Sequence, residues 1–131
     1  MALRTKCIKH PLGDSDGWRI SVMSHHTLDD GITHDPDITP EMYDEHCTRL
    51  SNPLLVGPLK RNEISWGAFE ERFLSYLKSP NVRSRLHSLV KLAETSDVTI
   101  LCVEETPEHC HRRLIAEACK EINPQLEIII E

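Results

Sequence analysis

One short stretch of the sequence concentrates residue types that can do chemistry. Positions 102–113 read Cys-Val-Glu-Glu-Thr-Pro-Glu-His-Cys-His-Arg-Arg. Cysteine supplies a nucleophile, imidazole carries protons near neutral pH, and guanidinium holds anions. A cysteine in the first turn of a helix also has its thiolate favoured by the helix dipole. We therefore predict a catalytic group with Cys110 as nucleophile, His111 as proton carrier and Arg112 as anion-holding residue. Cys110 is then the most reactive of the five thiols.

Two other interpretations of this stretch stay open. Cys110 can be a small buried residue and His111 a hydrogen-bonded core histidine, because structural networks also collect titratable groups. His109, Cys110 and His111 also have side chains that bind metal ions. However, helical positions two apart point in different directions, so His109 and His111 do not easily share one ion. No C-x-x-C motif occurs, and we expect no tightly bound structural zinc.

Standard catalytic motifs do not match this chain. A protein tyrosine phosphatase loop needs His-Cys, five residues and then arginine, but Ala116 occupies the position of that arginine. A Gly-rich stretch ending in Gly-Lys-Ser/Thr and a G-x-G-x-x-G are both lacking. Neither standard nucleotide site is therefore indicated, and we expect no cofactor.

A second polar segment, residues 25–38, follows a predicted strand and is longer than most connections, which is typical of functional loops. If the strands are parallel, this segment and 102–113 emerge at one edge of the sheet. The side chains that can face that stretch are His25, His26, His34, Asp29, Asp30, Asp35 and Asp37. Their spacing fits no standard metal site, and we favour a solvated loop. The residues predicted to bind substrate are Ser24, His25, His26, Glu104 and Arg113.

The hydrophobic pattern predicts the elements that position these groups. Strands are expected at 5–9, 18–24, 98–103 and 126–130. The run 98–103 is almost continuously apolar, which suits an inner parallel strand covered on both faces. Helices are expected at about 40–50, 66–77, 80–93 and 107–122, and a loop at 51–62. Each of the four helices begins with a hydroxyl-bearing cap residue, and in three of them proline follows the cap. Glu108 and Arg112 are expected to pair on the last helix.

These elements predict an α/β fold: a single three-layer domain over residues 1–131, with a mostly parallel sheet flanked by helices. A length of 131 residues suits one domain. The five cysteines are odd in number and widely spaced, so we expect reduced thiols and no intrachain disulfide. The chain has neither an apolar run of the ~20 residues that span a bilayer nor an apolar N-terminal stretch. We therefore expect a cytoplasmic protein that does not enter membranes.

The charge balance bears on partners. With 15 Lys plus Arg, 21 Asp plus Glu and a net charge of −6, the chain does not resemble a dedicated duplex-DNA binder. Nucleic-acid contact through five basic residues is the less favoured alternative, and it uses Arg83, Arg85, Lys91, Arg112 and Arg113. The oligomeric state is left open.

The stretch 99–113, with its strand ending in Leu-Cys, acidic loop and Cys-His-Arg at 110–112, resembles the hallmark of the family called domain of unknown function 488. The strand 17–22 and the Ser-Trp-Gly-Ala-Phe helix start at 65–69 are also similar to that family. The resemblance covers most of the chain and implies a compact α/β domain with the signature at the end of a central strand. It implies no particular reaction. After the second strand many members carry an Arg-rich, Trp-containing stretch, where this chain reads Ser-His-His-Thr-Leu at 24–28.

Together these patterns favour a small enzyme that acts on a small anionic substrate, or on a nucleic-acid fragment, at the carboxyl edge of the sheet. The alternative is a non-catalytic domain that binds an anion, a nucleic acid or a partner protein at the same edge. Replacement of Cys110 by serine separates the two, because it abolishes turnover but leaves passive binding nearly unchanged.

Overall fold

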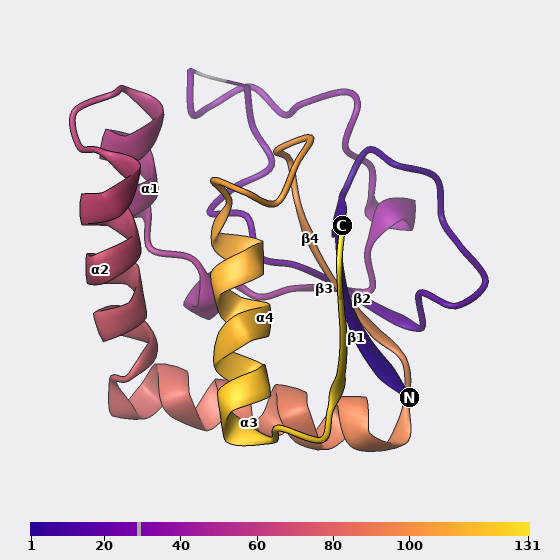
Figure 1. Cartoon of the computed structure of the whole chain (residues 1–131). Coiled ribbons are helices and arrows are strands. Elements are labelled where there is room, and N and C mark those ends of the chain that lie inside the picture. The colour runs from indigo at the N-terminus through magenta and orange to yellow at the C-terminus, as the bar shows by residue number, and fades with distance from the viewer. Residues whose placement is uncertain (29) are drawn as a thin grey trace.

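A five-stranded sheet forms the centre of the computed structural model, which describes residues 1–28 and 30–131 (Figure 1). Its strands are β1 (Ala2–Cys7), β2 (Trp18–Ser21), β3 (Glu45–His46), β4 (Val98–Cys102) and β5 (Glu127–Ile130). Their order across the sheet is β3-β2-β4-β1-β5, and every pair is parallel. The predicted α/β fold with a mostly parallel sheet is confirmed.

Strand β4 lies at the centre of this sheet, between β1 and β2. All five of its residues are buried, as expected for a strand covered on both faces. The prediction of an inner parallel strand in this part of the chain is confirmed. Ser21 is in register with Leu101, so β2 and β4 end at the same edge of the sheet and the segments that follow them emerge together.

Four α-helices and two 3₁₀ helices complete the described part of the chain. They are α1 (Pro53–Lys60), α2 (Trp66–Leu77), α3 (Pro80–Thr95), α4 (His111–Ile122), η1 (Pro40–Met42) and η2 (Thr48–Leu50). Helix α2 begins as predicted, because the Ser65 side chain accepts a hydrogen bond from the Ala68 amide at 3.1 Å. Helix α4 packs against β1, β4 and β5, and α2 and α3 pack against α4. In the described residues, no helix has both the length and the apolar character needed to cross a membrane.

The two faces of the sheet are covered differently. The α-helices lie on one side (Figure 1), and the other side is covered by residues 8–17 and η1. On this second face Arg4, Thr99 and Arg19 stand in one row across three strands. Such polar side chains would not pack against the apolar face of a helix. A third layer of irregular segments, rich in polar groups, covers them instead.

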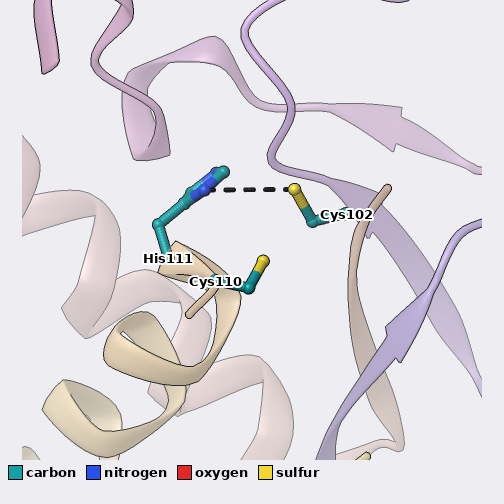
Figure 2. Close-up of side chains that lie close together, drawn as sticks. All are labelled: Cys102, Cys110 and His111. Atoms are coloured by element: carbon teal, nitrogen blue, oxygen red, sulfur yellow. Dashed lines mark hydrogen bonds between the residues drawn. The ribbon is translucent and has the colours of Figure 1, made fainter. Parts of the chain in front are cut away.

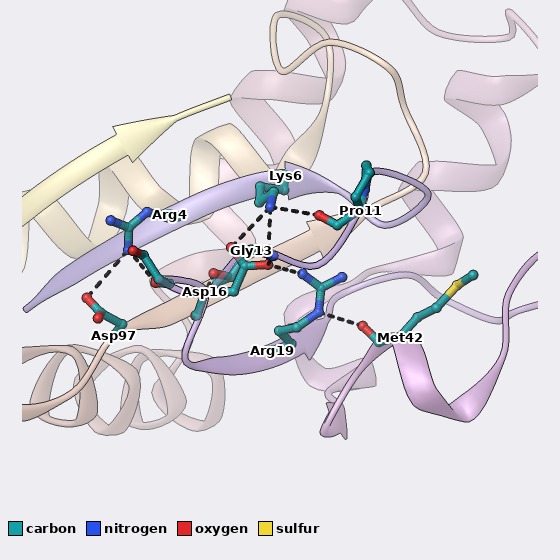
Figure 3. Close-up of polar contacts among 10 residues, drawn as sticks. Arg4, Lys6, Pro11, Gly13, Asp16, Arg19, Met42 and Asp97 are labelled. Atoms are coloured by element: carbon teal, nitrogen blue, oxygen red, sulfur yellow. Dashed lines mark hydrogen bonds and ion pairs between the residues drawn. The ribbon is translucent and has the colours of Figure 1, made fainter.

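Asp16 is the centre of the charged cluster on that face (Figure 3). Its carboxylate accepts hydrogen bonds from Lys6 at 3.1 Å and from Arg19. Burial alone would raise the pKa of Asp16, but the Gly13 amide and the two cations outweigh burial and lower it. Arg19 also donates to the Met42 carbonyl at 2.7 Å. The cluster therefore holds the segment before β2, and η1 itself, against the sheet.

Two of the expected elements are wrong. The expected helix over 40–50 is instead η1, β3 and η2, because the amides of Asp44 and Cys47 donate to carbonyls of β2 and hold this segment at the sheet edge. The expected loop over 51–62 contains α1. Asn52 caps that helix by accepting from the Leu54 amide at 3.1 Å, and Pro53 at the first helical position is a start signal rather than a breaker.

Candidate functional site

A pocket opens where β2 and β4 end. Its volume is about 80 Å³. Ser24 and His25 line it from the segment after β2, and Cys102 and Glu104 line it from the end of β4. Lys60 of α1 and His111 at the start of α4 complete its polar wall. The pocket therefore lies at the edge of the sheet that the sequence indicated.

The imidazole of His111 faces the Cys102 thiol in this pocket (Figure 2). Its Nε2 lies 2.7 Å from the Val22 carbonyl oxygen. A carbonyl only accepts hydrogen bonds, so the neutral ring carries its proton on Nε2 and leaves Nδ1 free to accept one. Nδ1 lies 3.9 Å from Cys102 Sγ. The arrangement is therefore a thiol beside an oriented proton acceptor.

A single carboxylate oxygen joins the two thiols of the site. Glu104 Oε2 accepts from Cys102 Sγ at 3.1 Å and from Cys110 Sγ at 3.3 Å. Burial alone would raise the pKa of Glu104, but the Cys102 thiol and the Lys60 ammonium outweigh burial and hold it below its usual value. Burial also opposes protonation of His111, yet the neighbouring Cys110 and the Val22 carbonyl raise its pKa.

Cys110 does not occupy the first helical turn as predicted. It is the N-cap of α4, because residues 107–110 form a turn in which the Cys110 amide donates to the Pro107 carbonyl at 3.2 Å. The predicted helix start at 107 is therefore wrong. Only 1% of Cys110 is exposed, and burial, followed by the neighbouring Cys102, raises the pKa of its thiol. Burial therefore opposes the thiolate that the helix dipole was predicted to favour.

Arg112 is fully buried, and its donors are used within the protein. Nη1 donates to the Glu104 carbonyl at 2.7 Å and to Cys110 Sγ at 3.3 Å. Nε and Nη2 donate to the Glu131 carbonyl at 3.3 Å. The expected pair with Glu108 is therefore not formed. Arg112 ties the loop after β4 to α4 and to the end of β5, and Lys60 is the cation that lines the pocket.

The structure separates the other residues predicted to bind substrate. Ser24 and His25 reach the pocket together with Glu104. His26 is buried elsewhere, with Nε2 2.7 Å from Ser21 Oγ and its ring stacked on His46. Arg113 donates to Glu117 at 3.0 Å and lies over the ring of Trp66.

The acidic segment 25–38 does not contribute a cluster of metal-binding side chains in its described residues. Asp30 accepts from the Ile32 and Thr33 amides at 2.9 and 2.8 Å, and His34 Nε2 lies 2.6 Å from the Ile38 carbonyl. These contacts close the loop on itself. Asp29 lies outside the described residues.

The basic residues considered for nucleic-acid binding do not share one free surface. Arg112 is buried. Arg85 donates to Glu45 at 2.6 Å and to Cys47 Sγ at 3.4 Å, and Arg113 pairs with Glu117. In the described residues, Arg83, Lys91 and the buried Arg112 are the members of this set that lack such a pairing with a carboxylate. The structure therefore gives no support to a basic interface built from this set.

Two polar residues that line the pocket, Cys102 and Lys60, were not predicted from the sequence. Cys102 was placed within the predicted inner strand 98–103. It is the last residue of β4, and ligands of parallel sheets bind next to the carboxyl ends of the strands. Lys60 was missed because α1 was taken for a loop. The Asn-Pro pair at 52–53 was the signal that could have found this helix.

The parallel sheet and the helices around it define an α/β protein, and a thiol and an imidazole lie next to each other at the carboxyl edge of the sheet. A family model described as "Active DUF488-N3 subclade" matches residues 3–123. The chain therefore belongs to the DUF488 family, and the resemblance found in the sequence is confirmed. No curated protein and no solved structure matches it.

Proposed function

We propose that the protein is an enzyme that attacks a small anionic substrate with the Cys102 thiolate. The observation that carries this proposal is the 3.9 Å approach of Cys102 Sγ to His111 Nδ1 at the wall of the pocket. A thiol beside a proton acceptor that a third group orients is the general arrangement of an activated nucleophile. Here the third group is the Val22 carbonyl. The description of the matching subclade as active agrees with an enzyme.

The proposed reaction follows from this geometry. The Cys102 thiol turns its hydrogen from Glu104 Oε2 to His111 Nδ1. Nδ1 takes this proton, and the sulfur forms a bond to an electrophilic carbon or phosphorus atom of the substrate. The bond to the leaving group breaks, and the leaving group receives the proton from His111. Water then attacks the covalent intermediate and gives a proton to His111, the bond to sulfur breaks, and His111 returns the proton to the Cys102 thiolate.

Lys60 supports an anionic substrate. It is the only lysine or arginine that lines the pocket in the part of the chain that the structure describes. Val56 and Val103 line the same space and provide apolar contact for the uncharged part of the molecule. Because the pocket has a volume of only about 80 Å³, it suits a small molecule rather than a folded nucleic acid.

Two chromogenic esters test this function. We expect metal-free protein to hydrolyse the para-nitrophenyl half ester of succinate faster than the neutral para-nitrophenyl acetate. Cys102→Ser should abolish nitrophenolate release, whereas Cys119→Ser, which replaces a buried thiol of α4 outside the pocket, should retain it. Lys60→Gln should remove most of the preference for the anionic ester.

Unchanged hydrolysis by Cys102→Ser would contradict the proposed nucleophile. Binding of the succinate half ester without turnover by the wild type would favour the non-catalytic anion-binding domain. In that case Cys102→Ser would bind the ester as tightly as the wild type does.

A further inference from the structure

We propose that Cys102, Cys110, His111 and Glu104 form a binding site for one Zn²⁺ ion. This site would regulate the proposed enzyme, because an ion bound there occupies the Cys102 sulfur and prevents it from acting as a nucleophile. Its existence depends on the four donors alone. The consequence for activity rests on the proposed function.

The donor atoms already converge. Cys102 Sγ, Cys110 Sγ and His111 Nδ1 all lie within 4.8 Å of one another. Glu104 Oε2 adds a fourth donor, 3.1 Å from the first sulfur and 3.3 Å from the second. In a tetrahedral zinc centre with ordinary bond lengths, neighbouring donors are about 3.3–3.8 Å apart. Three donors therefore already converge, and a shift of the Glu104 side chain brings a fourth ligand to the same ion.

The surroundings of the donors suit a metal site. Zinc-bound histidines usually donate the other ring N–H to a carbonyl or carboxylate, and His111 Nε2 lies 2.7 Å from the Val22 carbonyl. Arg112 Nη1 lies 3.3 Å from Cys110 Sγ. Two thiolates and a carboxylate around a doubly charged cation leave one negative charge, which the buried Arg112 offsets. This gives the buried guanidinium an electrostatic role.

The chemistry of the donors selects the ion. Thiolate and imidazole favour Zn²⁺ over Mg²⁺ and Ca²⁺, which prefer oxygen. The pocket gives an entry path, since Cys102, Glu104 and His111 line it. The site falls outside the patterns expected for structural zinc because its two cysteines are eight positions apart and meet only through the turn between β4 and α4.

Zinc titration of the reduced, chelator-treated full chain tests the site. In competition with a chromogenic chelator, we expect one Zn²⁺ per chain and about 10-fold or greater loss of affinity in Cys110→Ser and in Glu104→Gln. Cys119→Ser is the matched control and should bind as the wild type does. Co²⁺ in place of Zn²⁺ should give thiolate charge-transfer absorption and tetrahedral d–d bands, which weaken in Cys110→Ser.

Equal zinc affinity of the wild type and both site variants would overturn the site, and so would a Co²⁺ spectrum without thiolate charge transfer. Circular dichroism establishes that each variant is folded, and Glu104→Gln retains both thiols if Cys110→Ser fails to fold. If the metal-free protein hydrolyses the ester but binds no zinc, the metal site is wrong and the proposed function stands. Tight zinc binding by protein that never hydrolyses either ester would overturn the proposed function alone.

Discussion

The Val22 carbonyl oxygen lies 2.7 Å from His111 Nε2, although 89 positions separate the two residues in the chain. This contact joins the end of β2 to the start of α4 and turns Nδ1 of the ring toward Cys102. Parallel pairing of β2 with β4 brings the two segments together. The geometry of the candidate site therefore follows from the order of strands in the sheet.

Arg112 should be a structural residue. Replacing it by methionine removes the donors to the Glu104 carbonyl and to Cys110 Sγ, and we expect a loss of about 2–4 kcal/mol in the free energy of unfolding. Urea denaturation measures it. The neighbouring Arg113, whose pair with Glu117 is partly exposed, is the control, and Arg113→Met should cost about 1 kcal/mol or less. A stable Arg112→Met variant that has lost its preference for the anionic ester would restore the anion-holding role.

Gly17 should tolerate no side chain. Its φ is +62°, and a Cβ there would lie 1.9 Å from the Asp97 carbonyl oxygen, so Gly17→Ala combines backbone strain with a backbone clash. We expect a loss of more than about 2 kcal/mol in the free energy of unfolding. Gly31 has a φ of +72°, and among the described residues no heavy atom lies within 4 Å of the position of an added Cβ. Gly31→Ala should therefore cost only the strain of about 1 kcal/mol. Equal urea midpoints of the two variants would contradict this difference.

His26 should make stability fall in mild acid. Burial, followed by the neighbouring His46, His34 and His25, lowers its pKa to about 4 from 6.5. Between these values the unfolded chain binds a proton that the folded protein excludes, so the free energy of unfolding falls as pH falls from 6.5 to 4. We expect His26 to account for about 1–2 kcal/mol of that fall.

Replacing His26 by glutamine checks the assignment, because glutamine does not titrate and can still bond to Ser21. Urea denaturation of His26→Gln should show a shallower fall between pH 6.5 and 4 than the wild type. The exposed His87 on α3 is the control, and His87→Gln should keep the wild-type slope. Parallel pH profiles of the wild type and His26→Gln would refute the lowered pKa.

Local sequence patterns predicted the elements whose formation depends on interactions between residues close together in the chain. The apolar run at 98–102 specifies an inner strand, and the Ser65 cap specifies the start of α2. The segment 40–50 carries an equally good helix start, but hydrogen bonds from Asp44 and Cys47 to β2 decide its structure. Such pairing between distant segments is not visible in local propensity.

The same distinction applies to the site. The stretch 102–113 pointed to the edge of the sheet at which the pocket opens, and His111 lines that pocket. The sequence did not predict the surroundings of Arg112. The spacing of Glu108 and Arg112 suggests a helical ion pair, but it does not show that the guanidinium is buried and bonded to backbone carbonyls. Burial of Cys110 depends likewise on the turn at 107–110, which replaces the expected first turn of the helix.

Selective alkylation of Cys102 tests the central claim most directly. A short iodoacetamide pulse on metal-free protein at neutral pH, followed by peptide mapping, compares all five thiols, each of which is buried. The account predicts that Cys102 is labelled first, because it lines the pocket beside His111, and that His111→Gln slows its labelling while Cys7 and Cys47 react as before. Labelling of Cys102 no faster than that of Cys7, Cys47 or Cys110 would contradict it.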